Sequence, residues 1–192
     1  MTDETPISLW DLTTEETALS PEMDGDITTD LAIIGGGFTG LSTALHAAER
    51  GIDCHVLEAK KIGFGGSMGR VIGGDKGLSR RWARQRILAI FPELADIEFE
   101  KFWHGQIAMT PDHLPRIFRL ADGLYTPIGY NGRGITPGTM FGKAMADLVA
   151  GGHEGDMPLP VTNPSRVGST GIRSTMYDAA FTAKQIKDAY RR

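Results

Sequence analysis

Residues 30–51 read DLAIIGGGFTGLSTALHAAERG, and this stretch decides the fold. Residues 30–34 form a short apolar run that ends in glycine, which is typical of a strand buried on both faces of a parallel sheet. Residues 38–50 contain no proline, and their apolar positions recur with the spacing of one helical face, which predicts a helix. Gly51 then stands where glycine usually follows a helix C-terminus. A second short apolar run over 54–57 completes a predicted strand–helix–strand unit.

The turn between the first strand and the helix fits the pattern G-x-G-x-x-G through Gly35, Gly37 and Gly40. In a dinucleotide site the first glycine permits the tight turn, the second lets a pyrophosphate approach the helix N-terminus, and the third lets helix and strand pack closely. Glu58 ends the second strand, where a carboxylate accepts hydrogen bonds from ribose hydroxyls and repels a 2′-phosphate. The pattern predicts a dinucleotide other than NADP, with a glycine-rich turn that binds no ligand as the alternative. The expected contacts are Gly35, Gly37, Phe38, Thr39, Gly40, Glu58 and Ala59.

Beyond this pattern, residues 30–51 and 56–59 (VLEA) resemble the N-terminus of the D-amino-acid-oxidase-like FAD-dependent oxidoreductases. Residues 62–70 (IGFGGSMGR) are similar to that family's flavin-side loop, with one residue inserted and its asparagine absent. Residues 103–115 and 129–139 (GYNGRGITPGT) resemble the family's C-terminal part, in which a glycine-rich turn opens a helix that faces the flavin. The resemblance therefore implies FAD as the cofactor. It adds as expected contacts Ser67, Gly132, Arg133, Gly134 and Ile135.

The two resembling blocks are adjacent in this chain, although family members carry a long segment between them. The apparent junction lies near residues 71–77, and most of the substrate domain and the third parallel strand are missing there. We therefore expect an α/β fold, a Rossmann-like FAD-binding βαβ core with a reduced remnant of the substrate domain. Residues 1–28 are expected to form an N-terminal arm, and residues 29–192 a single FAD-binding Rossmann-like domain built from the family's N- and C-terminal blocks.

The rest of the chain shows weaker patterns. Ser79 is predicted to cap a helix over 80–91, whose four arginines are interpreted as a solvated face. Strand character appears over 97–109 and 124–128, helices are expected over 135–150 and 176–190, and residues 153–175 are expected to form a loop.

The composition excludes several classes of protein. Lys and Arg number 20 against 24 Asp and Glu, a net charge of −4 that argues against nucleic acid as a partner. No stretch is apolar enough to span a membrane, and the scattered histidines lack zinc-ligand spacing. The single cysteine and an acidic N-terminus without signal-peptide features favour a cytoplasmic protein. The sequence leaves the oligomeric state open.

By the resemblance, the chain is expected to oxidise a C–N bond of an amine or amino-acid-like small molecule by hydride transfer to FAD. Candidate residues on the flavin's substrate face are His104, Gln106 and Tyr130. Relatives that oxidise amino acids commonly carry an arginine near the position of Ile107, so the apolar residue favours an amine substrate. A non-catalytic, truncated dinucleotide-binding module is the alternative. An NAD-linked enzyme is a third reading, which leaves the downstream block unexplained.

Overall fold

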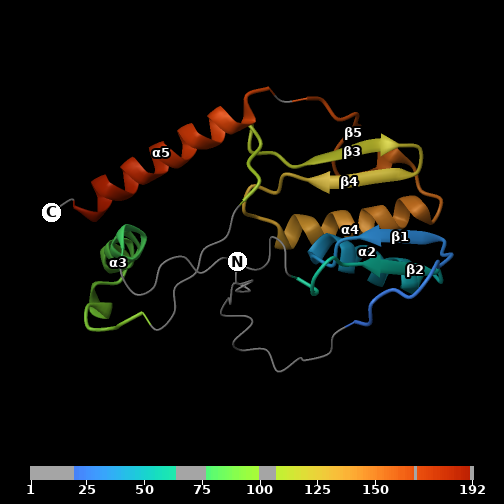
Figure 1. Cartoon of the computed structure of the whole chain (residues 1–192), viewed down its shortest axis with the longest axis horizontal. Coiled ribbons are helices and arrows are strands. Elements are labelled where there is room, and N and C mark those ends of the chain that lie inside the picture. Colours follow the sequence, from blue (N-terminus) through green and yellow to red (C-terminus); the bar gives the residue numbers. More distant parts are fainter. Residues whose placement is uncertain (1–19, 64–76, 100–106, 167, 191–192) are drawn as a thin grey trace. The chain divides into compact units, whose positions relative to one another are not determined.

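The computed structural model describes residues 20–63, 77–99, 107–166 and 168–190 (Figure 1). They fall into two compact units. The larger unit contains the described residues 20–63 and 107–164, and the smaller unit contains 77–99, 165–166 and 168–190. The N-terminal arm over 1–28, the single domain over 29–192 and the junction near 71–77 stay predictions.

The larger unit begins with the predicted strand–helix–strand unit. Strand β1 (Leu31–Ile34) leads into helix α2 (Phe38–Glu49), and strand β2 (Cys54–Leu57) returns parallel to β1. The register pairs Leu31 with Cys54 and Ile34 with Leu57. The fold is therefore mixed α/β with a parallel Rossmann-like βαβ unit, as the sequence predicted.

The two faces of this parallel sheet differ in burial. Ile33 lies on the face that α2 covers and is only 8% exposed, and the Cys54 thiol on the same face points to the Ala44 carbonyl oxygen at 3.6 Å. Ile34 lies on the opposite face and is 85% exposed. Parallel sheets are normally covered on both faces. The part of the chain that the structure describes therefore covers mainly the α2 side.

A second sheet packs on helix α4 (Ile135–Val149) in the same unit. Strand β3 (Arg116–Ala121) pairs antiparallel with β4 (Leu124–Ile128) and parallel with the short β5 (Val161–Thr162). Between this sheet and the helix lie Ile117, Phe141 and Met145, all nearly inaccessible to solvent. A short 3-10 helix, η2 (Glu154–Asp156), precedes β5.

The smaller unit pairs two helices, α3 (Leu78–Ile90) and α5 (Thr170–Ala189), with η1 (Pro92–Leu94) following α3. The rings of Trp82 and Phe181 meet edge to face with centroids 5.7 Å apart. The Trp82 indole N–H also donates to the Asp188 carboxylate at 3.4 Å.

Several boundaries of the smaller unit differ from the sequence predictions. Helix α3 begins at Leu78 after Gly77, whose φ of 136° suits glycine, and the Ser79 hydroxyl meets the Gln185 amide at 3.4 Å instead of capping the helix. Helix α5 begins at Thr170, within the stretch that was expected to be a loop up to residue 175.

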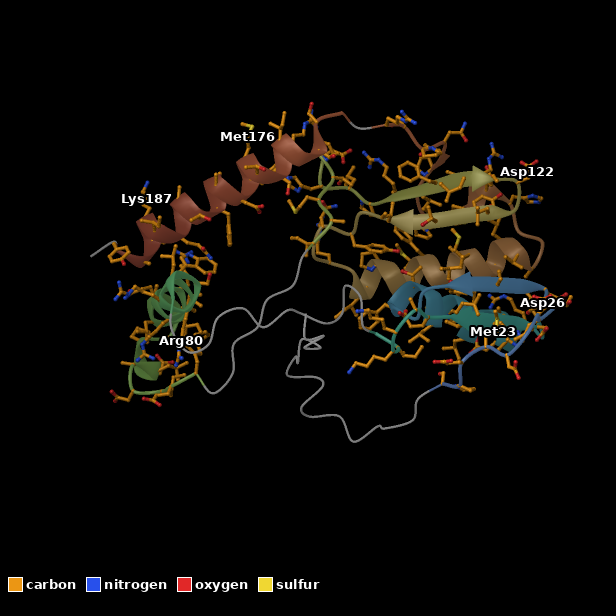
Figure 2. All side chains as sticks on the ribbon, viewed as in Figure 1. Met23, Asp26, Arg80, Asp122, Met176 and Lys187 are labelled. Atoms are coloured by element: carbon orange, nitrogen blue, oxygen red, sulfur yellow. The ribbon has the colours of Figure 1, made fainter. Side chains whose placement is uncertain are left out.

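The strand expected over 97–109 is wrong at its two described ends, since residues 97–99 and 107–109 are irregular. Arginines of α3 satisfy backbone carbonyls there that a sheet would otherwise pair: Arg84 donates to the Ile97 oxygen at 2.7 Å and Arg80 to the Phe99 oxygen at 3.3 Å. Arg80, labelled in Figure 2, also lies over the Phe99 ring. The interpretation of these arginines as a solvated face is therefore wrong for Arg80 and Arg84.

Candidate functional site

The glycine-rich turn between β1 and α2 has the geometry that its sequence predicts. Gly35 adopts a φ of 105°, which side chains disfavour. A Cβ at Gly40 would lie 2.0 Å from the Gly35 carbonyl oxygen, so the helix can follow the strand this closely only with glycine at that position. The turn brings the backbone N–H groups of the first helical turn to the carboxyl end of β1.

Gly37 precedes the helix and leaves space beside it. Its backbone is extended, with φ −86° and ψ −175°, which any residue can adopt, and a Cβ there would meet no atom within 4 Å. The first helical hydrogen bond runs from the Leu41 N–H to the Gly37 oxygen, and no described side chain caps the helix. The N–H groups of residues 38–40, at the start of the helix, therefore lack intrahelical acceptors.

Glu58 follows β2 and is held against the same turn. One carboxylate oxygen accepts the Gly36 N–H at 2.7 Å, and the other accepts the Lys60 N–H at 3.1 Å. The segment after Glu58 folds over the turn, since the Gly63 N–H donates to the Gly36 oxygen at 2.9 Å. Backbone contacts thus fix the carboxylate, and each oxygen retains a lone pair for a further donor.

A second tight turn precedes α4. Asn131 and Gly132 adopt φ values of 53° and 79°, and the Arg133 N–H donates to the Tyr130 oxygen at 3.0 Å. Helix α4 then begins at Ile135, with no described side chain as a cap. This helix N-terminus is a second place at which backbone N–H groups lack intrahelical acceptors.

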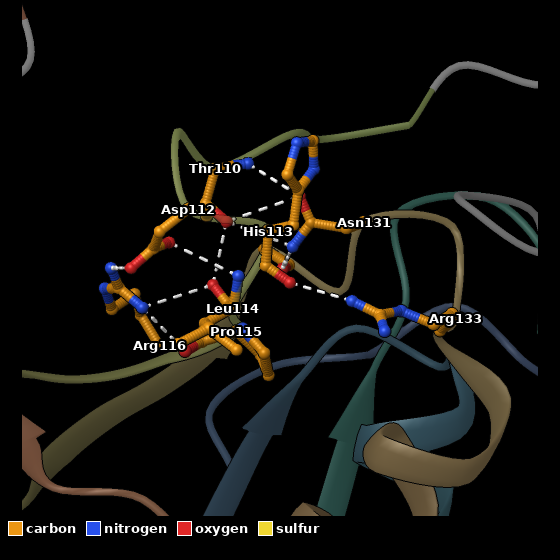
Figure 3. Close-up of polar contacts among 9 residues, drawn as sticks. Thr110, Asp112, His113, Leu114, Pro115, Arg116, Asn131 and Arg133 are labelled. Carbon is orange, nitrogen blue, oxygen red and sulfur yellow. Dashed lines mark hydrogen bonds and ion pairs between the residues drawn. The ribbon is translucent and has the colours of Figure 1, made fainter.

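The loop that precedes β3 supports this second turn (Figure 3). The Asn131 side-chain oxygen accepts the Thr110 N–H at 2.7 Å, and the Arg133 guanidinium donates to the His113 oxygen at 2.7 Å. In the same loop Arg116 forms an ion pair with Asp112, which lowers the pKa of that carboxyl. The side chains of Asn131 and Arg133 are thereby committed to the scaffold.

Helices α2 and α4 run in the same direction and pack closely together at two glycines of α4. A Cβ at Gly142 would lie 2.5 Å from the Ser42 Cβ, and one at Gly138 would lie 3.0 Å from the Thr39 hydroxyl. The Ser42 hydroxyl also donates to the Thr139 oxygen at 2.8 Å.

An ion pair connects the C-terminal ends of these two helices. Arg50 and Lys143 both pair with Asp147, and these contacts, first of all the hydrogen bond from Lys143, lower the pKa of that carboxyl. With the glycine contacts, the Arg50–Asp147 ion pair holds the two helices side by side, and both N-termini lie at the same end of the pair.

The structure brings the sequence-predicted cofactor residues into two groups. Gly35, Gly37, Phe38, Thr39, Gly40, Glu58 and Ala59 surround the first turn, and Gly132, Arg133, Gly134 and Ile135 form the second. The two groups meet where the Tyr130 hydroxyl contacts the Thr39 hydroxyl at 2.7 Å. Ser67, His104 and Gln106 lie outside the described residues.

Ile107 lies at the second turn, with its side chain 3.6 Å from where a Cβ at Gly132 would stand. Sequence reasoning missed the loop network around Asn131 and Thr110, although an asparagine inside a glycine-rich turn is a usual signal for positive φ. No group of three potential metal-ligating side chains occurs within the described ranges. In the same ranges no helix is both long and apolar enough to cross a membrane.

The residues present fit a dinucleotide. The backbone at Gly37 borders open space beside the α2 N-terminus, a fixed carboxylate stands at the end of β2, and the uncapped N–H groups favour an anion. These features define the class as a dinucleotide-binding βαβ unit.

Comparison with known proteins gives the family. The family model DAO, described as FAD dependent oxidoreductase, matches residues 30–74 and 73–148. The chain belongs to this family of FAD-dependent oxidoreductases.

Similar curated proteins include gamma-glutamylputrescine oxidoreductase of Escherichia coli, 58% identical over 45 residues that make up 23% of this chain and 11% of that protein. A probable oxidoreductase, OrdL, of Rhizobium meliloti is 29% identical over 128 residues, which are 66% of this chain and 30% of that protein. A D-amino acid dehydrogenase of a Methylobacterium strain is 34% identical over 79 residues, 41% of this chain and 19% of that protein. The matched parts thus span less than a third of each of these relatives. No solved structure matches the chain.

Proposed function

We propose that this chain binds FAD across the two helix N-termini and takes part in oxidising the C–N bond of a small amine. The observation that carries the proposal is the uncapped N-terminus of α2, which has open space at Gly37 and follows a turn whose Gly36 N–H holds the Glu58 carboxylate in place. Family membership supports FAD as the dinucleotide. The names of two relatives, a gamma-glutamylputrescine oxidoreductase and a D-amino acid dehydrogenase, support nitrogen-bearing substrates.

The chain's own residues would bind and orient the cofactor. The N–H groups of residues 38–40 would donate to the pyrophosphate, and Glu58 would accept from the ribose hydroxyls. The N–H groups after Gly134 would donate to the carbonyl edge of the flavin ring. When bound, FAD supplies the hydride-accepting chemistry, which oxidises the C–N bond to an imine that water then hydrolyses.

The proposed substrate class depends on Ile107, an apolar residue where an arginine would bind a substrate carboxylate. Ile107 packs at the second turn and offers no positive charge to a substrate carboxylate. An amine without an α-carboxylate is therefore the preferred substrate in this proposal. We also propose the cytoplasm as the location, since one cysteine suits a reducing compartment.

A second candidate function, FAD binding without turnover, is favoured by the exposure of Ile34. This residue ends β1, beside the proposed cofactor space, and is 85% exposed. Oxidative catalysis on a flavin usually needs a pocket that excludes water. Amine turnover separates the two candidates.

Three proteins test the proposal: the wild type, Gly37→Ala and Gly155→Ala. Both glycines have open space where a Cβ would stand and neither has a positive φ, so neither alanine should lower the melting temperature of the apoprotein. The measurements are FAD titration, the visible spectrum and thermal unfolding. The wild type and Gly155→Ala should bind FAD equally, and Gly37→Ala should bind at least about tenfold more weakly, because its methyl group occupies the pyrophosphate path.

A colourless wild type that takes up no added FAD would overturn the proposal. So would unimpaired FAD binding by Gly37→Ala. If the wild type binds FAD, a screen of amines against matching α-amino acids follows, and a preference for the amino acids would refute the proposed substrate class.

A further inference from the structure

One side-chain hydrogen bond joins the two turns of the candidate site. The Tyr130 hydroxyl lies 2.7 Å from the Thr39 hydroxyl, and the two residues are 91 positions apart in the chain. The Tyr130 ring packs against the Phe141 ring, with centroids 5.9 Å apart, so the core fixes the direction of the phenol. Burial raises the pKa of Tyr130, which keeps the phenol neutral and able to share a proton with Thr39.

The Thr39 end of this bond lies inside the first turn of α2. Thr39 stands between Gly37 and Gly40, and its carbonyl oxygen accepts the Thr43 hydroxyl at 2.8 Å. Its own N–H is one of the groups without an intrahelical acceptor. A displacement of the Thr39 side chain would therefore also displace the N–H groups at the α2 N-terminus.

The Tyr130 end of the bond lies on the second turn. The Tyr130 carbonyl oxygen accepts the Arg133 N–H at 3.0 Å, and the Tyr130 side chain contacts the place where a Cβ at Gly134 would stand, at 3.9 Å. Helix α4 begins at the next residue. Tyr130 therefore ties the start of α4 to the first turn of α2.

This position matters because the two helices are parallel. Their N-termini lie at the same end of the pair, and each carries a partial positive charge, so the ends repel each other until an anion lies near both. The Ser42 hydroxyl bond to Thr139 acts further along the helices, and Asp147 joins the opposite ends. At this end Gly138 also packs beside Thr39, but of the side-chain hydrogen bonds described above, the Tyr130–Thr39 bond lies nearest the N-termini.

We propose that Tyr130 is a positioning residue for the cofactor, which sets the spacing of the two helix N-termini through Thr39 instead of contacting the substrate. The proposal rests on the proposed function, because it concerns the same FAD. It differs from the sequence expectation that Tyr130 lines the substrate face, since the structure commits its hydroxyl to α2.

A double-mutant cycle tests the proposal with Tyr130→Phe, Thr39→Val and the combined variant. The readouts are the FAD dissociation constant from flavin fluorescence and the urea midpoint of the apoprotein. A neutral hydrogen bond accounts for a roughly two- to tenfold change in an equilibrium constant. Each single variant should therefore weaken FAD binding about two- to tenfold, and the combined variant should be no weaker than the worse single variant.

Two further variants serve as controls. Thr39→Ser keeps the hydroxyl and should bind FAD almost as the wild type does. Ser42→Ala removes the hydroxyl bond to Thr139, another contact between α2 and α4, so it should lower the urea midpoint and leave FAD affinity within about twofold of the wild type.

The outcomes separate the inference from the proposed function. A wild type that binds no FAD overturns both. FAD binding that is normal in the wild type and in Tyr130→Phe overturns only the positioning role, as does a fall in the urea midpoint without a change in affinity. If the two single effects multiply in the combined variant, the hydroxyls act independently, and the positioning role is refuted. If Tyr130→Phe yields no folded protein, Thr39→Val and Thr39→Ser probe the same bond from its other end.

Discussion

Replacing Gly142 by alanine is expected to destabilise the larger unit by pushing α2 and α4 apart. The new Cβ would lie 2.5 Å from the Ser42 Cβ, 2.6 Å from the Thr39 carbonyl oxygen and 2.8 Å from the Ser42 hydroxyl. The first two atoms are fixed by the α2 backbone, so rotating a side chain cannot relieve the clash. Ordinary contact begins at 3.4 Å, which requires the helices to separate locally by about 0.9 Å.

The magnitude follows from three opposing effects. Overpacking a well-packed contact costs about 1–3 kcal/mol. Moving Ser42 away from the Thr139 oxygen costs about 1 kcal/mol more. Alanine favours a helix over glycine by about 1 kcal/mol, which offsets part of that loss. The net destabilisation is about 2 kcal/mol, and for a chain of this size it lowers the melting temperature by about 4–8 °C.

Thermal unfolding followed by circular dichroism measures this effect, with two graded controls. Gly138→Ala places its Cβ 3.0 Å from the Thr39 hydroxyl, which can yield, so its effect should be smaller. Gly171→Ala lies in α5 with no atom within 4 Å and should be neutral or slightly stabilising. A Gly142→Ala protein as stable as the wild type would refute the direct helix contact.

Three other predictions concern the carboxylates and the smaller unit. Glu58→Ala should weaken FAD binding more than Glu58→Gln, because the amide oxygen of glutamine can still accept the Gly36 N–H, and titration of the two variants checks this. Asp147→Asn should lower the melting temperature at pH 7. The folded-state pKa of Asp147 lies below 3.8, chiefly because of Lys143, so the carboxylate stabilises the fold above that pH and the difference between variant and wild type should vanish on acidification. Phe181→Ala should destabilise the α3–α5 pair by about 1 kcal/mol through loss of the aromatic contact, visible as a weaker near-UV circular dichroism signal from the α3 indole.

The βαβ unit could be predicted because its signals are local. A run of apolar residues, the glycines at 35, 37 and 40 and the glycine at 51 each specify backbone geometry within a few residues. The structure has the expected order, with α2 over Phe38–Glu49 against the predicted 38–50. The glycine at 51 adopts a φ of 73°, as a residue after a helix C-terminus should.

Other elements depend on contacts distant in sequence, which a local pattern does not contain. Strand β3 was missed, because its residues 116–121 show no clear alternation and acquire their order from pairing with β4 and β5. The expected strand at 97–99 is irregular because arginines of α3 satisfy its carbonyls. The Tyr130–Thr39 bond joins residues 91 positions apart, and glycines within α4 gave no sign that α2 would be their partner.

The larger unit is built from two separate stretches of chain, 20–63 and 107–164, which meet through α2 and α4. Its core contacts therefore do not depend on how many residues connect the two stretches. Closing a longer flexible connection adds only about 0.6 kcal/mol for each doubling of its length. A family built on this unit can lose or gain long inserts at one position in evolution while the helix pair stays folded, which makes the connection a natural place for new domains to arise.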